Sequence, residues 1–579
     1  MKFASHITYL AMVQALVIGI SACGQPGNGS QPQRDGSLPD DQRETATQQR
    51  AQPLPAPAVA ADAAVPAAAH KLQRMAAETA MTGSVAASPY PAPAVDREHY
   101  LHYEHNGVML VSEQPLSTFS VDVDTASYAN IRRMLMREGR LPPVDAVRLE
   151  EMINYFSYDY PPPAARTRPF SVHTELAPAP WSSGHQLLQI GLKGFQAPPA
   201  RRPPANLVFL VDVSGSMHSA DKLGLVKQSL RLLVNRMTAA DRIALIVYAG
   251  AAGTVLESTP GSDKATILAA LDGLEAGGST HGSAGIALAY ALARQHYIDQ
   301  GINRVIIASD GEMNVGTVDL EALRNMVQRQ RQSGISLTTL GFGSGNYNYA
   351  LMEQLADVGN GNAAYIDSLR EAQKVLVNEL QSTLLTIASD VKVQVEFNPA
   401  LVSEYRLIGY ENRLLQREDF GNDKVDAGDI GAGHTVTALY EIVLANSDGQ
   451  RIPTLRYGAA EPTPASKRDE LALVKLRYKR PGENRSVELS RVIAAGDGSR
   501  TLAAASDDLR FAASVAGFGQ LLQGGIFTGD WDYDDALGLA RGARGDDPHG
   551  YRAEFINLVE LAQSLSPQSG RQQLPGSNQ

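Results

Sequence analysis

The stretch Asn206-Leu-Val-Phe-Leu-Val-Asp-Val-Ser-Gly-Ser-Met217 decides the fold of this chain. Its first part, Leu207 to Val211, is an uninterrupted run of β-branched or bulky apolar residues. Such a run is typical of a strand buried on both faces of a parallel sheet. Ligands bind at the carboxyl ends of strands in open α/β sheets, where Asp212, Ser214 and Ser216 follow this strand. Taken alone, these residues are equally compatible with a metal loop of hard oxygen ligands and with an ordinary turn.

Apolar runs and helical patterns alternate from Asn206 to about Leu385. Because strands separated by helices are typical of a doubly wound parallel sheet, the sequence predicts an α/β domain here. The predicted strands are Leu207–Val211, Arg242–Tyr248, Thr254–Leu256, Arg304–Ser309, Ser336–Phe342 and Ala363–Ile366. The predicted helices are Lys222–Met237, Lys264–Glu275, Ser283–Gln300, Leu320–Ser333, Tyr349–Val358 and Leu369–Leu385.

On both sides of this domain the apolar residues alternate with polar ones, which indicates strands with one wet face. Such strands are expected around Phe119–Val123, Phe170–Leu176, Leu188–Leu192, Val391–Phe397, Val436–Leu444 and Val474–Tyr478. Helices are expected at Ala129–Arg137, Asp145–Phe156, Leu509–Leu522 and Arg552–Leu565. We expect the flanking strands to pair into one β-sandwich-like domain, in which the α/β domain is inserted and which carries helices at its C-terminal end.

Length and composition indicate several globular domains and argue against nucleic-acid binding. The chain has 579 residues, of which 44% are hydrophobic and 20% are charged, which suits more than one domain. Its net charge of -11 does not fit the basic face that nucleic-acid binding requires. The predicted order is a lipoprotein signal peptide (1–23), a disordered tether (24–97), an N-terminal segment (98–200), the α/β domain (205–385), a β-rich and helical C-terminal domain (390–565) and a disordered tail (566–579).

The single cysteine, Cys23, closes a short N-terminal stretch that begins with a lysine and continues as the mostly apolar run Ile7–Ile20. This stretch predicts a secretory signal peptide, because it is too short for a transmembrane helix. Ile20-Ser-Ala-Cys23 resembles the bacterial lipobox, in which the cysteine becomes the lipidated first residue. The resemblance implies a lipid anchor at Cys23 in the membrane of a bacterial cell envelope. By resemblance to enterobacterial sorting rules, Gly24 in place of an aspartate favours the outer membrane, facing the periplasm or the surface. The alternative is an ordinary signal peptide with a chance cysteine.

Two further loops bear on the choice between a metal loop and a turn. Gly277-Gly-Ser-Thr280 precedes a predicted helix, and Ser309-Asp-Gly-Glu312 ends a predicted buried strand. In a doubly wound sheet both loops can reach the edge where Asp212 lies. Two carboxylates and three hydroxyls then converge, which approximates an Mg2+ shell whose other positions are held by water. The five predicted ligands are Asp212, Ser214, Ser216, Thr280 and Asp310.

The combination of D-x-S-x-S, a threonine in a glycine-rich loop and S/T-D-G resembles the metal-ion-dependent adhesion site of von Willebrand factor type A (vWA) domains. The resemblance implies that Ser214, Ser216 and Thr280 bind the cation through their hydroxyls. Asp212 and Asp310 would act mainly through bound water. The implied cation is Mg2+, with Mn2+ or Ca2+ as alternatives, and an Asp or Glu carboxylate of a partner protein would complete its shell.

Longer segments resemble the YfbK-type bacterial lipoproteins. They are Phe119-Ser-Val-Asp-Val-Asp-Thr-Ala-Ser-Tyr128, Glu150-Glu-Met-Ile-Asn-Tyr-Phe156 and Asp310-Gly-Glu-Met-Asn-Val-Gly316. The resemblance implies an N-terminal segment, a vWA domain and a C-terminal domain of uncharacterised function. It brings no settled biochemical role.

Weaker motifs have plainer explanations. Asp122-x-Asp124 begins like a calcium loop, but Ser127 and Arg133 stand where an EF-hand needs Gly and Glu. We therefore reject an EF-hand and interpret the two aspartates as a structural capping pair. Asp530-Trp-Asp-Tyr-Asp-Asp535 favours a capped helix start over a patch that docks a partner.

The predicted function is the binding of a partner protein through the cation, without catalysis. A partner carboxylate would replace water on a cation that the protein neutralises only in part. One alternative is a metal-assisted hydrolase that uses the same cation, with Glu312 or His281 as the nearest candidate base. Another alternative is a cation that serves only to hold the three loops together.

Overall fold

The structure, a computed structural model, describes residues 97–164, 167–196, 202–278, 282–312, 320–445, 447–453 and 467–566. The predicted signal peptide with Cys23, nearly all of the predicted tether and the tail from residue 567 lie outside these ranges, as do Thr280 and His281. Within the described ranges, the helices are all too short or too polar to span a bilayer.

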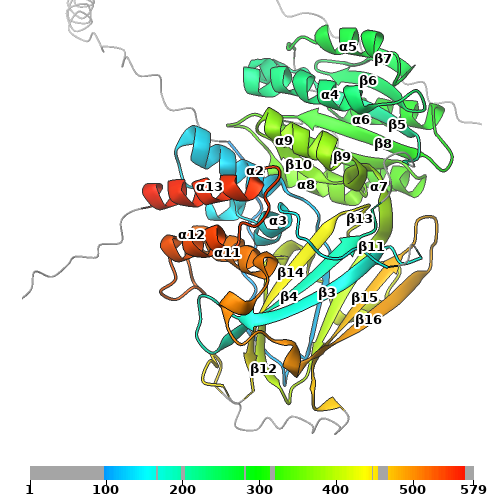
Figure 1. Cartoon of the computed structure of the whole chain (residues 1–579). Coiled ribbons are helices and arrows are strands. Elements are labelled where there is room, and N and C mark those ends of the chain that lie inside the picture. Colours follow the sequence, from blue (N-terminus) through cyan, green and yellow to red (C-terminus); the bar gives the residue numbers. More distant parts are fainter. Residues whose placement is uncertain are drawn as a thin grey trace, which may run out of the picture. The chain divides into compact units, whose positions relative to one another are not determined.

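A six-stranded sheet forms the centre of the α/β domain in the described residues, with the order β10-β9-β8-β5-β6-β7 (Figure 1). The strands are β5 (Ala205–Asp212), β6 (Arg242–Tyr248), β7 (Ala252–Pro260), β8 (Ile302–Ser309), β9 (Ser336–Phe342) and β10 (Ala363–Ile366). All neighbours are parallel except β6 and β7, which are antiparallel. The expected parallel sheet is therefore a mixed one, because the connection between β6 and β7 is too short for the crossover that parallel strands need.

Helices cover both faces of this sheet, which explains why β5 is buried along its whole length. On one face, α4, α5 and α9 pack against odd-numbered residues of β5 such as Leu207 and Phe209. On the other face, α6, α7 and α8 pack against Val208 and Leu210. The helices of the domain are α4 (Leu225–Arg236), α5 (Lys264–Asp272), α6 (Gly282–Gln295), α7 (Leu320–Gln332), α8 (Tyr349–Val358), α9 (Leu369–Gln373) and α10 (Leu380–Leu384).

Besides the α/β sheet, the described residues form two antiparallel sheets. Each contains strands that precede the α/β domain in the sequence and strands that follow it. The first has the order β1-β12-β14-β4-β3 and the second β13-β11-β15-β16, with β2 paired to β11. The strands are β1 (Met109–Leu110), β2 (Leu116–Ser120), β3 (Phe170–Pro178), β4 (His185–Gly194), β11 (Thr386–Phe397), β12 (Val402–Ile408), β13 (Ile430–Gly431), β14 (Thr435–Leu444), β15 (Glu470–Lys479) and β16 (Ser486–Ala494). Because β4 pairs with β14 and β2 with β11, the prediction of an inserted α/β domain is confirmed.

The two sheets form a sandwich, since one apolar core contains side chains from both, such as Ile190 and Val436 from the first and Val393 and Val474 from the second. A separate core lies between the other face of the first sheet and a group of helices, and it includes Leu187 of β4. These helices are α2 (Ala126–Arg133), α3 (Leu149–Asn154), α11 (Asp507–Leu522), α12 (Tyr533–Gly542) and α13 (Tyr551–Leu565). Two helices from before the α/β domain and three from the end of the chain thus share one core.

Short irregular turns interrupt several predicted helices. The 3-10 turns are Val144–Ala146, Gly215–His218, Glu411–Arg413, Arg417–Gly421, Ala495–Asp497 and Leu502–Ala504, and the π-helical turns are Met134–Glu138, Ala220–Gly224 and Lys374–Asn378. The helix predicted from Lys222 therefore begins regularly only at Leu225. At the other end of the chain, the predicted helix start in 530–535 is confirmed: Asp532 caps α12 and accepts hydrogen bonds from the N–H groups of Asp534 and Asp535.

Candidate metal centre

Two neighbouring parallel strands bring Asp212 and Asp310 to the same edge of the α/β sheet. β5 ends at Asp212 and β8 ends at Ser309, one residue before Asp310, and Val211 is in register with Ala308. Both aspartates are fully buried. The apolar run that makes β5 a central strand is thus also what places a carboxylate at the end of the sheet.

The loop after β5 presents its two serine hydroxyls side by side. Ser214 Oγ and Ser216 Oγ lie 3.0 Å apart. Two oxygen ligands at neighbouring corners of an Mg2+ octahedron are also about 3.0 Å apart, because each is about 2.1 Å from the ion. Ser214 is buried and Ser216 is half-buried, so the pair combines a fixed position with access from solvent.

Hydrogen bonds hold the Asp212 carboxylate in place. Its Oδ1 accepts from the N–H of Ser214 at 2.9 Å. Its Oδ2 accepts from the hydroxyls of Ser309 at 2.9 Å and Tyr248 at 3.1 Å. Burial raises the pKa of Asp212 to about 6; the N–H of Ser214 opposes this rise and the charge of Asp310 adds to it. Ser309, the first residue of the S/T-D-G motif, thus uses its hydroxyl to orient Asp212.

Asp310 has a positively charged partner that the sequence analysis missed. The ammonium group of Lys222 lies 3.0 Å from Asp310 Oδ2 and 2.8 Å from Asn346 Oδ1. Asn346 Nδ2 donates to the same Asp310 oxygen at 3.0 Å, and the N–H of Glu312 donates to Oδ1 at 3.1 Å. The pattern in the sequence placed Lys222 at the start of a helix, where a lysine is ordinary, so only the tertiary structure shows this contact.

Two glycines make the arrangement around Asp310 possible. Gly311 has a φ of 84°, and a Cβ at this position would lie 2.4 Å from the backbone nitrogen of Asn348. Gly343 has a φ of 76°, and a Cβ there would lie 2.3 Å from Cε of Lys222. The first glycine lets the Asp310 loop lie against the start of α8, and the second gives the stem of Lys222 room to reach the site.

The described part of the glycine-rich loop, which ends at Gly278, contacts the serine loop. The N–H of Gly277 donates to the carbonyl of Val213 at 2.7 Å, and the carbonyl of Gly278 accepts from the N–H of Gly215 at 3.1 Å. Thr280 itself lies outside the described residues. Of the five predicted ligands, the structure therefore brings Asp212, Ser214, Ser216 and Asp310 to one edge.

These residues fit a hard divalent cation. Carboxylate and hydroxyl oxygens are the ligands that Mg2+ prefers, and the spacing of the two serine hydroxyls matches an octahedral edge. Of the two candidate bases for hydrolysis, His281 is outside the described residues. Glu312 contributes its backbone N–H to Asp310.

The pair Asp122 and Asp124 does not cap a helix, which corrects our interpretation from the sequence. The N-cap of α2 is Thr125, and it makes no side-chain capping hydrogen bond. Asp124 Oδ1 instead accepts from the N–H of Ala363 at 2.8 Å, on β10. Asp122 Oδ1 accepts from the guanidinium of Arg413 at 3.0 Å. The two aspartates face partners far away in the sequence, which a local pattern cannot reveal.

Comparison with protein families finds three matching family models. The one described as von Willebrand factor type A domain matches residues 206–379. The one described as Uncharacterized protein YfbK, C-terminal, matches residues 382–565. A third, described as von Willebrand factor, matches residues 94–189.

Individual proteins are similar to different extents. Uncharacterized protein YfbK of Escherichia coli (strain K12) is 47% identical over 476 residues, which are 81% of this chain and 81% of that one. Inter-alpha-trypsin inhibitor heavy chain H3 of Pongo abelii is 26% identical over 261 residues, covering 41% of this chain and 29% of that protein. The solved structure of von Willebrand factor type A from Catenulispora acidiphila is 14% identical with a TM-score of 0.38, and the match covers 69% of this chain and 91% of that chain.

Proposed function

This chain belongs to the YfbK family, and from that premise we propose that it is a cell-envelope lipoprotein whose vWA domain binds a partner protein through a divalent cation. Mg2+ is the cation that the ligand set favours, with Mn2+ or Ca2+ as substitutes. The partner would supply an aspartate or glutamate carboxylate. No nucleic acid and no catalysis are involved in this proposal.

The observation that carries the proposal is the meeting of four predicted ligands at one sheet edge. Ser214 and Ser216 offer two hydroxyl oxygens 3.0 Å apart. Asp212 and Asp310 are held in position by hydrogen bonds from other parts of the domain before any ion binds. Thr280 would add the third hydroxyl.

The charges around the site favour an anionic partner. Asp212 and Asp310 carry two negative charges, and Lys222 adds one positive charge beside Asp310. A divalent cation would therefore leave an excess of about one positive charge. A partner carboxylate that replaces a water on the cation would neutralise this excess, and its attraction is strong because the surroundings are largely buried.

The lipid anchor at Cys23 belongs to the same proposal. The lipobox-like Ile20-Ser-Ala-Cys23 and the Pro-, Ala- and Gln-rich stretch after it support a globular part held at a bacterial membrane by a tether. Gly24 supports the outer membrane. A tethered binding module would meet partners in the periplasm or at the cell surface.

The direct experiment is metal-dependent capture of proteins from an envelope extract. Wild-type protein should retain a partner in Mg2+ and lose it in EDTA, and Mg2+ should restore binding. Asp212→Ala should lose the partner in all conditions. A matched control is Asp272→Ala, which removes an exposed carboxylate from the end of α5 and should bind normally.

Three outcomes would contradict the proposal. Capture that is unchanged by EDTA and by Asp212→Ala would exclude a metal-bridged interface. Turnover of an ester, phosphoester or peptide that disappears in Glu312→Gln would favour the hydrolase instead. Loss of thermal stability on chelation, with capture retained, would leave the cation only a structural role.

A further inference from the structure

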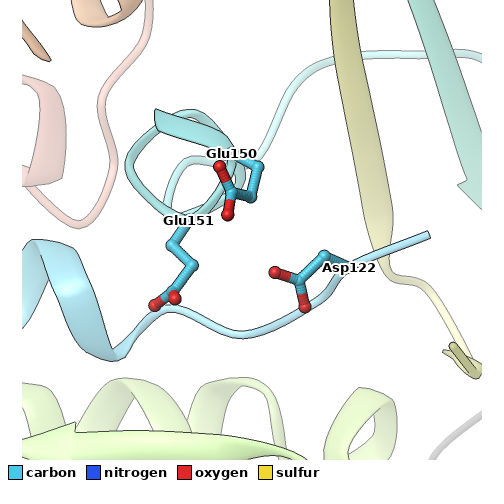
Figure 2. A group of neighbouring side chains, drawn as sticks. All are labelled: Asp122, Glu150 and Glu151. Atoms are coloured by element: carbon cyan, nitrogen blue, oxygen red, sulfur yellow. The ribbon is translucent and has the colours of Figure 1, made fainter. Parts of the chain in front are cut away.

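Three carboxylates that are not part of the proposed adhesion site meet where the N-terminal segment packs on the α/β domain. Asp122 follows β2, and Glu150 and Glu151 lie in the first turn of α3. Each offers an oxygen atom, and these three atoms all lie within 4.8 Å of one another. Figure 2 shows the two glutamates projecting from α3 and Asp122 pointing from its loop toward them.

The cluster is buried, and two of its oxygens have no donor. Asp122 is 3% exposed, and Glu150 and Glu151 are 0% exposed. Among the described residues, no hydrogen-bond donor reaches Asp122 Oδ2 or Glu150 Oε1. A buried carboxylate oxygen without a partner is costly, so two of them in one cluster indicate that something else binds there.

The protein neutralises this region only in part. Arg413 contacts Asp122 at 3.0 Å and Asp124 at 3.3 Å, and it also pairs with Asp357. These contacts leave Glu150 and Glu151 without an ion pair among the described residues. Burial raises the pKa of Glu150 to about 8 and raises that of Glu151 well above its ordinary value, and the charge of Asp122 adds to both shifts.

We propose that Asp122, Glu150 and Glu151 bind a second divalent cation, and that this cation is Ca2+. Because the three oxygen atoms lie within 4.8 Å of one another, one ion placed between them can be reached by all three carboxylates. Mg2+ tends to keep several waters and to use one or two carboxylates, whereas three carboxylates in a buried place suit Ca2+.

A cavity lies beside one member of the cluster, Asp122. A cavity of about 170 Å³ is lined by Asp122 and Asp124 together with Asp357, Asn412 and Arg413. Its walls come from the N-terminal segment, from the end of α8 and from a loop of the sandwich. Ca2+ can reach Asp122 through this acidic cavity, which supplies the entry path that a metal site needs.

The cation would join the loop after β2 to α3, and a hydrogen bond of Glu151 links this centre to the vWA domain. Glu151 accepts hydrogen bonds from the hydroxyl of Tyr349, on α8, and from the N–H of Ser127 at 2.8 Å. Asn346, close before Tyr349 in the chain, contacts Asp310 of the adhesion site. One short stretch of chain thus contacts both metal centres.

The test is Ca2+ titration by calorimetry on protein in which the adhesion site is disabled by Asp212→Ala. This variant should bind one Ca2+, and its Tm should rise by about 3 °C or more at about 1 mM Ca2+. Adding Glu150→Gln and Glu151→Gln should weaken that binding by roughly 100-fold or more and abolish the rise in Tm. Adding Glu396→Gln and Glu488→Gln, two exposed glutamates, should leave both unchanged.

Removal of two buried charges should leave the protein folded in EDTA, and circular dichroism checks this. If the double glutamine variant does not fold, Asp122→Asn in the same Asp212→Ala background gives the same readout. The proposal is wrong if Asp212→Ala protein binds no Ca2+, which would mean that protons neutralise the cluster. It is also wrong if Ca2+ raises the Tm of the glutamine variants as much as that of their parent.

Discussion

Replacing Lys222 with methionine should tighten Mg2+ binding at the proposed adhesion site by about tenfold or more. The Lys222 ammonium lies 3.0 Å from Asp310 Oδ2, and the side chain is buried beside Gly343. A cation bound at Asp310 must either remain close to this positive charge or displace it. Methionine keeps most of the apolar stem and removes the charge. The bound cation is then neither repelled by residue 222 nor forced to displace it.

The magnitude follows from comparing the two costs. If Lys222 stays, a single and a double positive charge about 6 Å apart repel by about 1.4 kcal/mol in water and by about 5.5 kcal/mol at an effective dielectric constant of 20. If Lys222 leaves, it loses its hydrogen bonds to Asp310 and Asn346, each of about 1.5–3 kcal/mol for a charged group. The cheaper route therefore costs at least about 1.4 kcal/mol, which is one power of ten in affinity.

Isothermal titration of Mg2+ into the wild type and Lys222→Met measures this difference. Lys227→Met is the matched control, because Lys227 lies in the first turn of α4, five residues after Lys222, but donates to the carbonyl of Asp272 at 2.9 Å. Its Mg2+ affinity should remain within about twofold of the wild type, since surface charges are well screened. Equal or weaker Mg2+ binding by Lys222→Met would refute the reasoning, because Lys222 would then assist the cation.

Three further predictions concern stability. Burial alone would raise the pKa of Glu441, but its hydrogen bond with His185 and the nearby arginines lower this pKa to about 2. The lowered pKa stabilises the folded protein by up to about 3 kcal/mol. This stabilisation is complete above about pH 4.5 and is lost as the pH falls toward 2. Urea midpoints between these pH values should fall steeply in the wild type and less steeply in Glu441→Gln. Arg132→Met should lower the free energy of unfolding by about 3–5 kcal/mol in a urea titration, because it leaves three buried carboxylates without their common partner; a loss under 1 kcal/mol would contradict this reasoning. Gly311→Ala should cost about 1–3 kcal/mol because of its positive φ and the contact with Asn348, and its thermal unfolding should show a Tm below that of the wild type.

Sequence patterns predicted the elements of the α/β domain well because its central strands are covered by helices on both faces. β6, β9, β10 and α8 have the bounds that were expected. Strands covered by helices on both faces are continuous apolar runs, and the ligand-bearing loops follow directly from the ends of such runs. The resemblance to YfbK-type proteins is confirmed along most of the chain.

The sandwich was predicted less completely because its strands bury polar residues. β12 contains Glu404 and Arg406, both buried, and Arg406 pairs with Glu441 of β14 at 2.7 Å. Buried charges break the alternation that marks a strand, so β12 was missed. β16 was missed for a different reason: as the last strand of its sheet it is largely exposed and has little apolar patterning.

The contacts that set the charge balance of each proposed metal centre could not be predicted from local patterns. Lys222 reaches Asp310 because a π-helical turn gives it non-helical dihedral angles before α4 begins. Asp122 meets Glu150 and Glu151 only when β2 has paired with β11 and α3 has packed on α11. Such contacts depend on tertiary packing, whereas the D-x-S-x-S motif lies within one loop and can be recognised from the sequence alone.

The most direct test of the central claim is capture of an envelope partner by wild-type protein and by Ser216→Ala, each in Mg2+ and in EDTA. Ser216 is half-buried and small, so its loss removes one hydroxyl with little effect on folding. We predict that only wild-type protein in Mg2+ retains the partner, and that an excess of free glutamate weakens the retention. Equal retention in all four samples would contradict a carboxylate bound through the cation.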